Sequence, residues 1–135
     1  MMKVLVGYGS VYVGQRIVKS VMEFQNTEIV GVSREPDEIT ALVRERDPEV
    51  VILDTSLAQG RGLEVLRELK TYAAPPVVIA LTSFWNERYM RMYIEAGADY
   101  YFHAADEHEK VCDVIVRMLS VSSPSGGLSM ADRNE

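Results

Sequence analysis

The 135-residue sequence contains one cysteine, Cys112. A single cysteine cannot form an internal disulfide, which fits a reducing compartment. Because Cys112 lies in a segment with an apolar helical pattern, we expect a buried structural thiol rather than a reactive one.

Long apolar runs and basic blocks are also missing. The longest apolar stretches are about as long as a strand, too short to span a bilayer. The N-terminus lacks a basic region followed by an apolar stretch and a cleavage site. These absences predict a cytoplasmic protein without membrane contact. With 14 basic and 20 acidic residues and a net charge of −6, direct nucleic-acid binding through phosphates is disfavoured.

The length suits one domain, and the hydrophobic fraction of 47% is enough for a packed core. The composition changes near the C-terminus, where serine, glycine and proline replace the apolar residues. We therefore predict a folded domain at 1–121 and a flexible tail or truncated linker at 122–135.

Apolar strand patterns alternate five times with amphipathic helical patterns. Ser10 and Asn86 suit helix N-caps, Pro36 suits the first position of a helix, and Gly97 suits a left-handed helix stop. Such alternation predicts an α/β domain whose parallel sheet is covered by helices on both faces. The predicted strands are 3–7, 28–32, 50–54, 77–81 and 98–102.

Asp54 ends the most continuous of these strands, Val50–Asp54 (VVILD). A β-branched apolar run of this kind is typical of a central strand buried on both faces. Open α/β sheets place their sites at the carboxyl ends of such strands. Asp54 is therefore the first candidate for a functional carboxylate.

Four segments together resemble the receiver domains of two-component response regulators. They are VVILD with the downstream GLEVLRELK, then VVIALTS, then EAGADYYF, and the resemblance covers residues 3–120. It implies a CheY-like, flavodoxin-like fold: a doubly wound five-stranded parallel sheet of order 2-1-3-4-5 in a three-layer sandwich. It also implies a signalling role in a phosphorelay rather than an enzymatic activity.

The resemblance implies a site of five elements: two acidic residues after the first strand, an aspartate that is phosphorylated, a Thr or Ser after the fourth strand and a Lys after the fifth. In this chain the phosphoacceptor position is Asp54 and the hydroxyl position is Thr82. The acidic pair falls on Tyr8 and Gly9, and the lysine falls on Ala104. The input site is therefore degenerate, as in a pseudo-receiver.

Each loss has a chemical consequence. Mg²⁺ is held by carboxylates and phosphate oxygens, and it neutralises charge during phosphoryl transfer. With only Asp54 left, we expect weak or absent Mg²⁺ binding, no metal site, no cofactor and very slow or absent phosphorylation. The segment Leu57-Ala58-Gln59 also departs from the usual Met-Pro-Gly-like turn after the aspartate.

Three side chains near this site leave alternatives open. Tyr8 either donates a hydrogen bond to Asp54 or points to solvent. Thr82 either joins a hydrogen-bond network with Asp54 or satisfies a backbone group at the strand end. His103 precedes the lysine position, but adjacent strand residues point to opposite faces, which disfavours it as a substitute cation.

The output half of the switch is better preserved. Tyr101 matches the family's aromatic switch position, which responds to the hydroxyl at Thr82. By resemblance, a protein partner, either a sensor kinase or an output protein, binds the fourth helix, fifth strand and fifth helix. Arg88, Tyr89 and Arg91 are candidate contacts, although an ordinary solvated helix face fits them too. The sequence also leaves open whether the chain forms a homodimer.

A dinucleotide-binding domain is the alternative reading. Gly7-Tyr8-Gly9 follows the first strand, as the glycine-rich turn of such domains does. However, Tyr12 occupies the place of the third glycine. Arg34, at the end of the second strand, suits a 2′-phosphate and therefore NADP.

Overall fold

A computed structural model of the protein describes residues 1–122. Of the predicted tail 122–135, all but Ser122, the last residue of α5, lies outside the described residues. None of the described helices is long and apolar enough to cross a membrane. The elements are β1 (Met2–Gly7), α1 (Val11–Met22), β2 (Thr27–Ser33), α2 (Pro36–Arg46), β3 (Val50–Asp54), the 3₁₀ turn η1 (Leu57–Gln59), α3 (Gly62–Leu69), β4 (Val77–Thr82), α4 (Glu87–Glu95), β5 (Tyr100–His103) and α5 (His108–Ser122).

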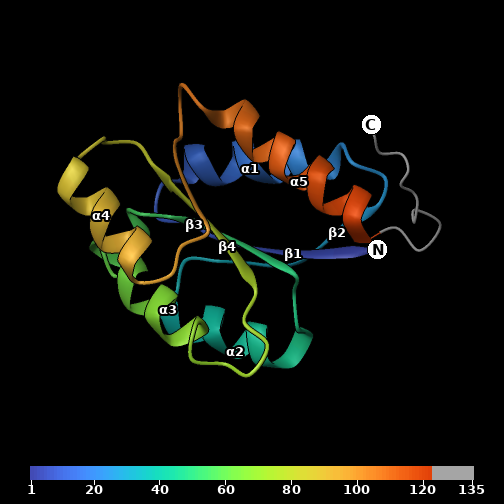
Figure 1. Ribbon diagram of the computed structural model, residues 1–135, viewed down its shortest axis with the longest axis horizontal. Coiled ribbons are helices and arrows are strands. Elements are labelled where there is room, and N and C mark those ends of the chain that lie inside the picture. The colour runs from blue at the N-terminus through green and yellow to red at the C-terminus, as the bar shows by residue number, and fades with distance from the viewer. Residues whose placement is uncertain (123–135) are drawn as a thin grey trace.

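The five strands form one parallel sheet of order β2-β1-β3-β4-β5, which confirms the predicted topology. Helices α1 and α5 cover one face, and α2, α3 and α4 lie on the other side (Figure 1). β2 and β5 are the two edges of the sheet. The carboxyl ends of all strands lie at one edge of this sandwich, where the turns after β1, β3 and β4 meet.

The central strands supply the two halves of the core. In β3, Val51 and Leu53 pack with α2 and α3, whereas Val50 and Ile52 pack with α1 and α5. This alternation follows from the two-residue period of a strand. Every residue of β3 is buried, so Asp54 is held at the end of a rigid, fully covered strand.

The predicted start and stop signals occupy their places. The Ser10 hydroxyl accepts a hydrogen bond from the Val13 N–H at 3.3 Å, and the Asn86 side chain accepts one from the Tyr89 N–H at 3.1 Å. Pro36 is the first residue of α2. Gly97 follows α4 with φ of 110°, in the left-handed region that glycine tolerates best. All four signals are therefore confirmed.

Cys112 is only partly buried, which corrects the expectation of a buried thiol. The buried side of α5 carries Val111, Val114 and Ile115, and Cys112 lies beside that side. Burial, with the nearby negative charge of Asp113, raises the pKa of its thiol. A raised pKa keeps the thiol protonated, so the prediction of an unreactive cysteine agrees with its surroundings.

Candidate functional site

The Asp54 carboxylate is buried, at 1% exposure, and both of its oxygens accept hydrogen bonds. Oδ2 accepts from the Gly9 N–H at 3.0 Å, the Ser10 N–H at 2.8 Å and the Ser56 hydroxyl at 2.9 Å. Oδ1 accepts from the Ser56 N–H at 3.0 Å. The turn after β1 therefore meets Asp54 with backbone N–H groups at the positions where the resemblance implies acidic side chains.

Gly9 makes this close approach possible. A Cβ added to Gly9 would lie 2.2 Å from the Ser56 carbonyl oxygen, far inside van der Waals contact. The space that an acidic side chain at position 9 needs is filled by the backbone of the turn after β3. In that turn Ala58 and Gln59 have φ of 46° and 60°, followed by Gly60 at 99°. The off-pattern loop noted in the sequence thus folds over Asp54.

Tyr8 takes neither of the two predicted positions. Its ring lies against Gly14, where an added Cβ would come within 2.7 Å of the Tyr8 Cγ. On another side, the Arg34 guanidinium lies 5.6 Å from the ring centroid, a cation–π distance. The ring is therefore half-buried between α1 and β2 rather than bonded to Asp54 or free in solvent.

Thr82 satisfies a backbone group, the second of its two predicted roles. Its hydroxyl donates to the Phe84 carbonyl at 2.8 Å and accepts from the Phe84 N–H at 3.2 Å. Within residues 1–122 it has no hydrogen bond to Asp54, so a phosphate-free network between the two is not formed. The hydroxyl instead fixes the turn that leads from β4 to α4.

The lysine position holds no cation. Ala104 is buried, its N–H donates to the Thr82 carbonyl at 2.7 Å, and its carbonyl accepts from Arg16 at 3.4 Å. His103 Nδ1 faces Asp106 at 3.6 Å, so His103 does not replace the lysine. Among the described residues Asp54 forms no ion pair, and no group of three or more His, Cys, Asp or Glu is placed to hold a metal.

Tyr101 lies inside an aromatic cluster. It is 8% exposed, and its ring centroid is 5.6 Å from those of Trp85 and Tyr93. Its buried hydroxyl has no hydrogen-bond partner in the described part of the chain. Burial raises the pKa of Tyr101, and the neighbouring Thr82 hydroxyl partly opposes that increase without reaching hydrogen-bond geometry. Thr82 and Tyr101 are therefore brought together, as the sequence predicts.

The turn from β4 to α4 exposes aromatic residues that the sequence reasoning missed. Phe84 is 74% and Trp85 46% exposed, and Tyr89, a predicted contact, is 45% exposed. A cavity of about 600 Å³ lies beside them. The missed signal was the pair Phe84-Trp85 immediately before the Asn86 cap. The residues that line the cavity are Phe84, Asn86, Arg88, Tyr89 and Met92.

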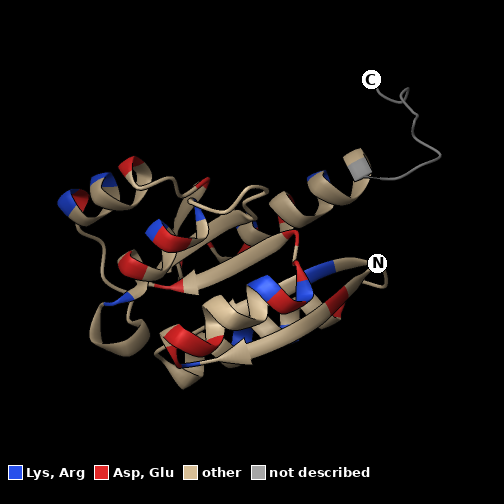
Figure 2. Ribbon diagram, turned by 90° about the horizontal axis from the view of Figure 1, so that it is seen from below, with Lys and Arg blue, Asp and Glu red and all other residues tan. Residues whose placement is uncertain are grey.

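Within residues 1–122, positive and negative side chains are mixed along the helices. Figure 2 shows Lys and Arg interspersed with Asp and Glu over the helices. Arg88 and Arg91 are both exposed on α4. The expectation that direct nucleic-acid binding is disfavoured stays a prediction.

The turn at Gly7-Tyr8-Gly9 does not present a dinucleotide site. The N–H groups of Gly9 and Ser10, which such a turn would direct at a pyrophosphate, donate to Asp54 instead. Arg34 lies over the Tyr8 ring and donates to the Gly9 carbonyl at 3.3 Å. The geometry therefore does not favour the NAD(P) alternative.

Comparison with known proteins agrees with this topology. Residues 13–115 match the response regulator receiver domain family. The chemotaxis protein CheY of Halobacterium salinarum is 26% identical over 106 residues, which cover 78% of this chain and 88% of that protein.

Solved structures show the same fold. The signal receiver domain of the response regulator NarL from Mycobacterium tuberculosis superposes with a TM-score of 0.78 at 15% identity, covering 87% of this chain and 94% of that one. A DNA-binding response regulator of the LuxR family from Staphylococcus aureus gives 0.77 at 23% identity, covering 87% and 98%.

Proposed function

Since the chain belongs to the response regulator receiver domain family, we propose that it is an atypical, non-enzymatic receiver that signals through protein contacts with little or no phosphate on Asp54. A cytoplasmic location accompanies this role. The observation that carries the proposal is the closed surroundings of Asp54, whose carboxylate already accepts four hydrogen bonds.

Phosphorylation requires an Asp54 oxygen to attack phosphorus in line with the leaving group. Both oxygens face N–H or O–H donors, and each hydrogen bond to a charged acceptor is worth about 1.5–3 kcal/mol. Some of these bonds must break before a phosphodonor can approach. No cation stands at Ala104 to stabilise the charge that develops. The reaction therefore lacks both access and electrostatic support.

Weak Mg²⁺ binding follows from the same geometry. Mg²⁺ demands near-octahedral oxygen coordination and gives up its waters reluctantly. Asp54 offers one carboxylate, and its neighbours Gly9 and Ser10 present N–H donors, which repel a cation. The donor set does not fit Mg²⁺, so we assign the ion no step in the mechanism.

Treatment with acetyl phosphate and Mg²⁺, followed by intact-protein mass spectrometry, tests this half of the proposal. We expect no phosphoryl adduct on the wild type. The matched control is Asp54→Asn, which preserves the shape of the side chain and removes the nucleophile. A stable, Mg²⁺-dependent adduct on the wild type that is absent from Asp54→Asn would overturn the proposal.

Receiver domains exchange signals with partner proteins such as kinases and output domains. In this chain the exposed part of α4 and the turn before it, here called the output face, supports such a contact. Its residues are Phe84, Trp85, Arg88, Tyr89 and Arg91. Tyr101 is buried beneath Trp85, so we propose that it acts on a partner by setting the position of Trp85. A homodimer through this face stays a prediction.

Photo-cross-linking in cells tests the output face. A photoreactive residue at Arg91 on α4 should capture a partner, whereas the same residue at Arg67, exposed on α3, should not. We expect capture to persist in Asp54→Asn and to weaken in Tyr101→Ala. Loss of capture in Asp54→Asn with no effect of Tyr101→Ala would show that Asp54 is still the working input.

A further inference from the structure

The carboxyl edge of the sheet holds a polar pocket beside the Asp54 site. Its volume is about 550 Å³. Asp54, Thr82 and Ala104 are not among the residues that line it, so it is separate from the receiver site. We call it the switch-point pocket. Its polar lining comes from the turns after three strands: Gly9 after β1, Arg34 and Glu35 after β2, and Ser56, Gln59 and Arg61 after β3.

The topology of the sheet explains why a pocket forms at this place. β1 and β3 are neighbours, but the chain leaves them toward opposite faces, since α1 covers one face and α3 the other (Figure 1). Where the connections diverge in this way, open α/β sheets bind their ligands outside the carboxyl ends of the strands. The volume also lies within the range of small-molecule sites, about 300–1,000 Å³.

The pocket has a positive charge excess in an acidic chain. Two arginines and one glutamate line it, although the chain carries a net charge of −6. Arg34 donates to the Gly9 carbonyl at 3.3 Å, and the Arg61 Nε pairs with Glu64 at 3.2 Å. Within residues 1–122 the other N–H groups of both guanidinium groups have no hydrogen-bond partner. Each arginine therefore keeps donors for an anion, and phosphate is the anion whose oxygens fit such a fork best.

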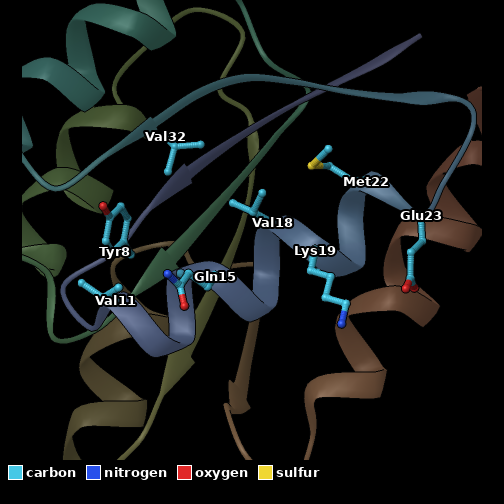
Figure 3. A pocket seen from close by; sticks show the side chains of 9 residues that line it. Tyr8, Val11, Gln15, Val18, Lys19, Met22, Glu23 and Val32 are labelled. Carbon is cyan, nitrogen blue, oxygen red and sulfur yellow. The ribbon is translucent and has the colours of Figure 1, made fainter.

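Tyr8 holds Arg34 in position. The Tyr8 ring stands at the end of a separate, apolar hollow between α1 and β2, near Val11 and Val32 (Figure 3). It packs on Gly14, and the Arg34 guanidinium lies 5.6 Å from its centroid. This cation–π contact restricts the arginine before a ligand arrives, which lowers the entropic cost of binding.

The remaining side chains of the pocket select the rest of the ligand. Glu35 is exposed, and its carboxylate has no hydrogen bond or ion pair among the described residues. It repels phosphate but accepts hydrogen bonds from hydroxyl groups. The Gln59 amide can both donate and accept. The lining contains no aromatic ring on which a nucleotide base could stack. The pocket therefore suits a hydroxyl-bearing body rather than a nucleobase.

We propose that the switch-point pocket binds a small sugar or polyol phosphate, whose phosphate group lies between Arg34 and Arg61. The hydroxyl groups of the ligand bond to Glu35 and Gln59. Both arginines stand outside the shell of donors that surrounds Asp54, so binding needs neither Mg²⁺ nor a covalent step. This inference does not depend on whether Asp54 is phosphorylated.

Two-dimensional NMR titrations of the full chain test the proposal, with glucose 6-phosphate as the probe and EDTA present throughout. Glucose and inorganic phosphate each supply one half of the probe and serve as its controls. We expect glucose 6-phosphate to shift the amide signals of Gly9, Arg34, Gln59 and Arg61. It should bind about tenfold more tightly than either control, because only the whole probe reaches both the arginines and the hydroxyl acceptors.

Matched arginine variants show whether the pocket itself is responsible. Arg61→Gln should weaken glucose 6-phosphate about tenfold, and the exposed pair with Glu64 that it removes adds little to stability. Arg34→Lys keeps the charge but not the fork and should also weaken it. Arg67→Gln, exposed on α3 outside the pocket, should have no effect. Glu35→Gln should narrow the difference between glucose 6-phosphate and inorganic phosphate.

Four results would overturn the proposal. Shifts centred on Thr82 and Ala104 would place the anion in the receiver site instead. Equal effects of Arg61→Gln and Arg67→Gln would show only general charge attraction. Inorganic phosphate binding as tightly as glucose 6-phosphate would show that the hydroxyl groups are not recognised. Tighter binding of adenosine monophosphate than of glucose 6-phosphate would show that the pocket prefers a nucleotide.

Discussion

Asp54 and Tyr101 lie two strands apart at the same edge of the sheet, and their polar atoms have opposite surroundings. The Asp54 oxygens accept four hydrogen bonds. The buried Tyr101 hydroxyl has none within the described residues. A fully bonded buried group resists displacement, whereas an unbonded one gains by moving. We therefore expect the Asp54 side chain to stay in place and any conformational change to centre on Tyr101.

The largest effect on stability should come from removing the Asp54 carboxylate. Asp54→Ala leaves the N–H groups of Gly9, Ser10 and Ser56 without their carboxylate, which should lower the free energy of unfolding by about 3 kcal/mol. Urea denaturation measures it. Asp113→Ala, an exposed aspartate of α5, is the matched control and should change little. If both substitutions changed the free energy of unfolding equally, the hydrogen bonds to Asp54 would not be what stabilises this region.

A methyl group at Gly9 should separate the two turns that enclose Asp54. Gly9→Ala places a Cβ against the Ser56 backbone and should cost about 2 kcal/mol, together with faster hydrogen exchange at the Ser10 amide. Gly31→Ala is the control in β2, because the nearest neighbour there is the flexible end of Leu42 at 2.9 Å. A Gly9 variant as stable as the Gly31 variant would contradict the close approach.

Replacing Tyr101 should change stability in the opposite direction. Tyr101→Phe removes an unpartnered buried hydroxyl and should raise the free energy of unfolding by about 1 kcal/mol. Tyr72→Phe is the comparison, since that hydroxyl contacts Arg44 and Glu68 at 3.1 and 3.0 Å and its loss should be mildly destabilising. A loss of stability in Tyr101→Phe would mean that the hydroxyl has an ordered partner.

The smallest effect concerns the turn over Asp54. Ala58 has φ of 46° and ψ of 48°, where a Cβ costs about 1–2 kcal/mol. Ala58→Gly relieves this strain, but glycine also makes the unfolded chain more flexible, which offsets part of the gain. We therefore expect a net stabilisation of about 0.5 kcal/mol. Ala41→Gly, inside α2, should instead destabilise it by about 1 kcal/mol. Thermal unfolding of the pair distinguishes the two signs.

The fold was predictable because its signals are local. Continuous apolar strands such as Val50–Asp54 and end signals such as Ser10, Asn86 and Gly97 act within a few residues of themselves. The positions of Asp54, Thr82 and Tyr101 followed from the same pattern, since each stands at a fixed place on a strand. It is equally visible in the sequence that Tyr8 and Gly9 carry no carboxylate.

The groups that surround Asp54 in place of acidic side chains were not predictable. Asp54 is held mainly by backbone N–H groups. Every residue except proline has such a group, so the sequence does not indicate which ones bind the carboxylate. The place of Tyr8 depends on Gly14 and Arg34, and only the folded chain brings the three together. The cover that Trp85 gives to Tyr101 likewise depends on how a turn after β4 bends back over β5.

The contact between Gly9 and Ser56 also limits the evolutionary routes open to the protein. An acidic residue does not fit at position 9 while the Ser56 carbonyl lies 2.2 Å from where its Cβ would be. The turn over Asp54 must first adopt another backbone conformation, and that change by itself does not favour phosphoryl transfer. A single codon change at position 9 therefore passes through a destabilised intermediate. We therefore expect that an acidic pair after β1 needs changes in the turn over Asp54 as well as at positions 8 and 9.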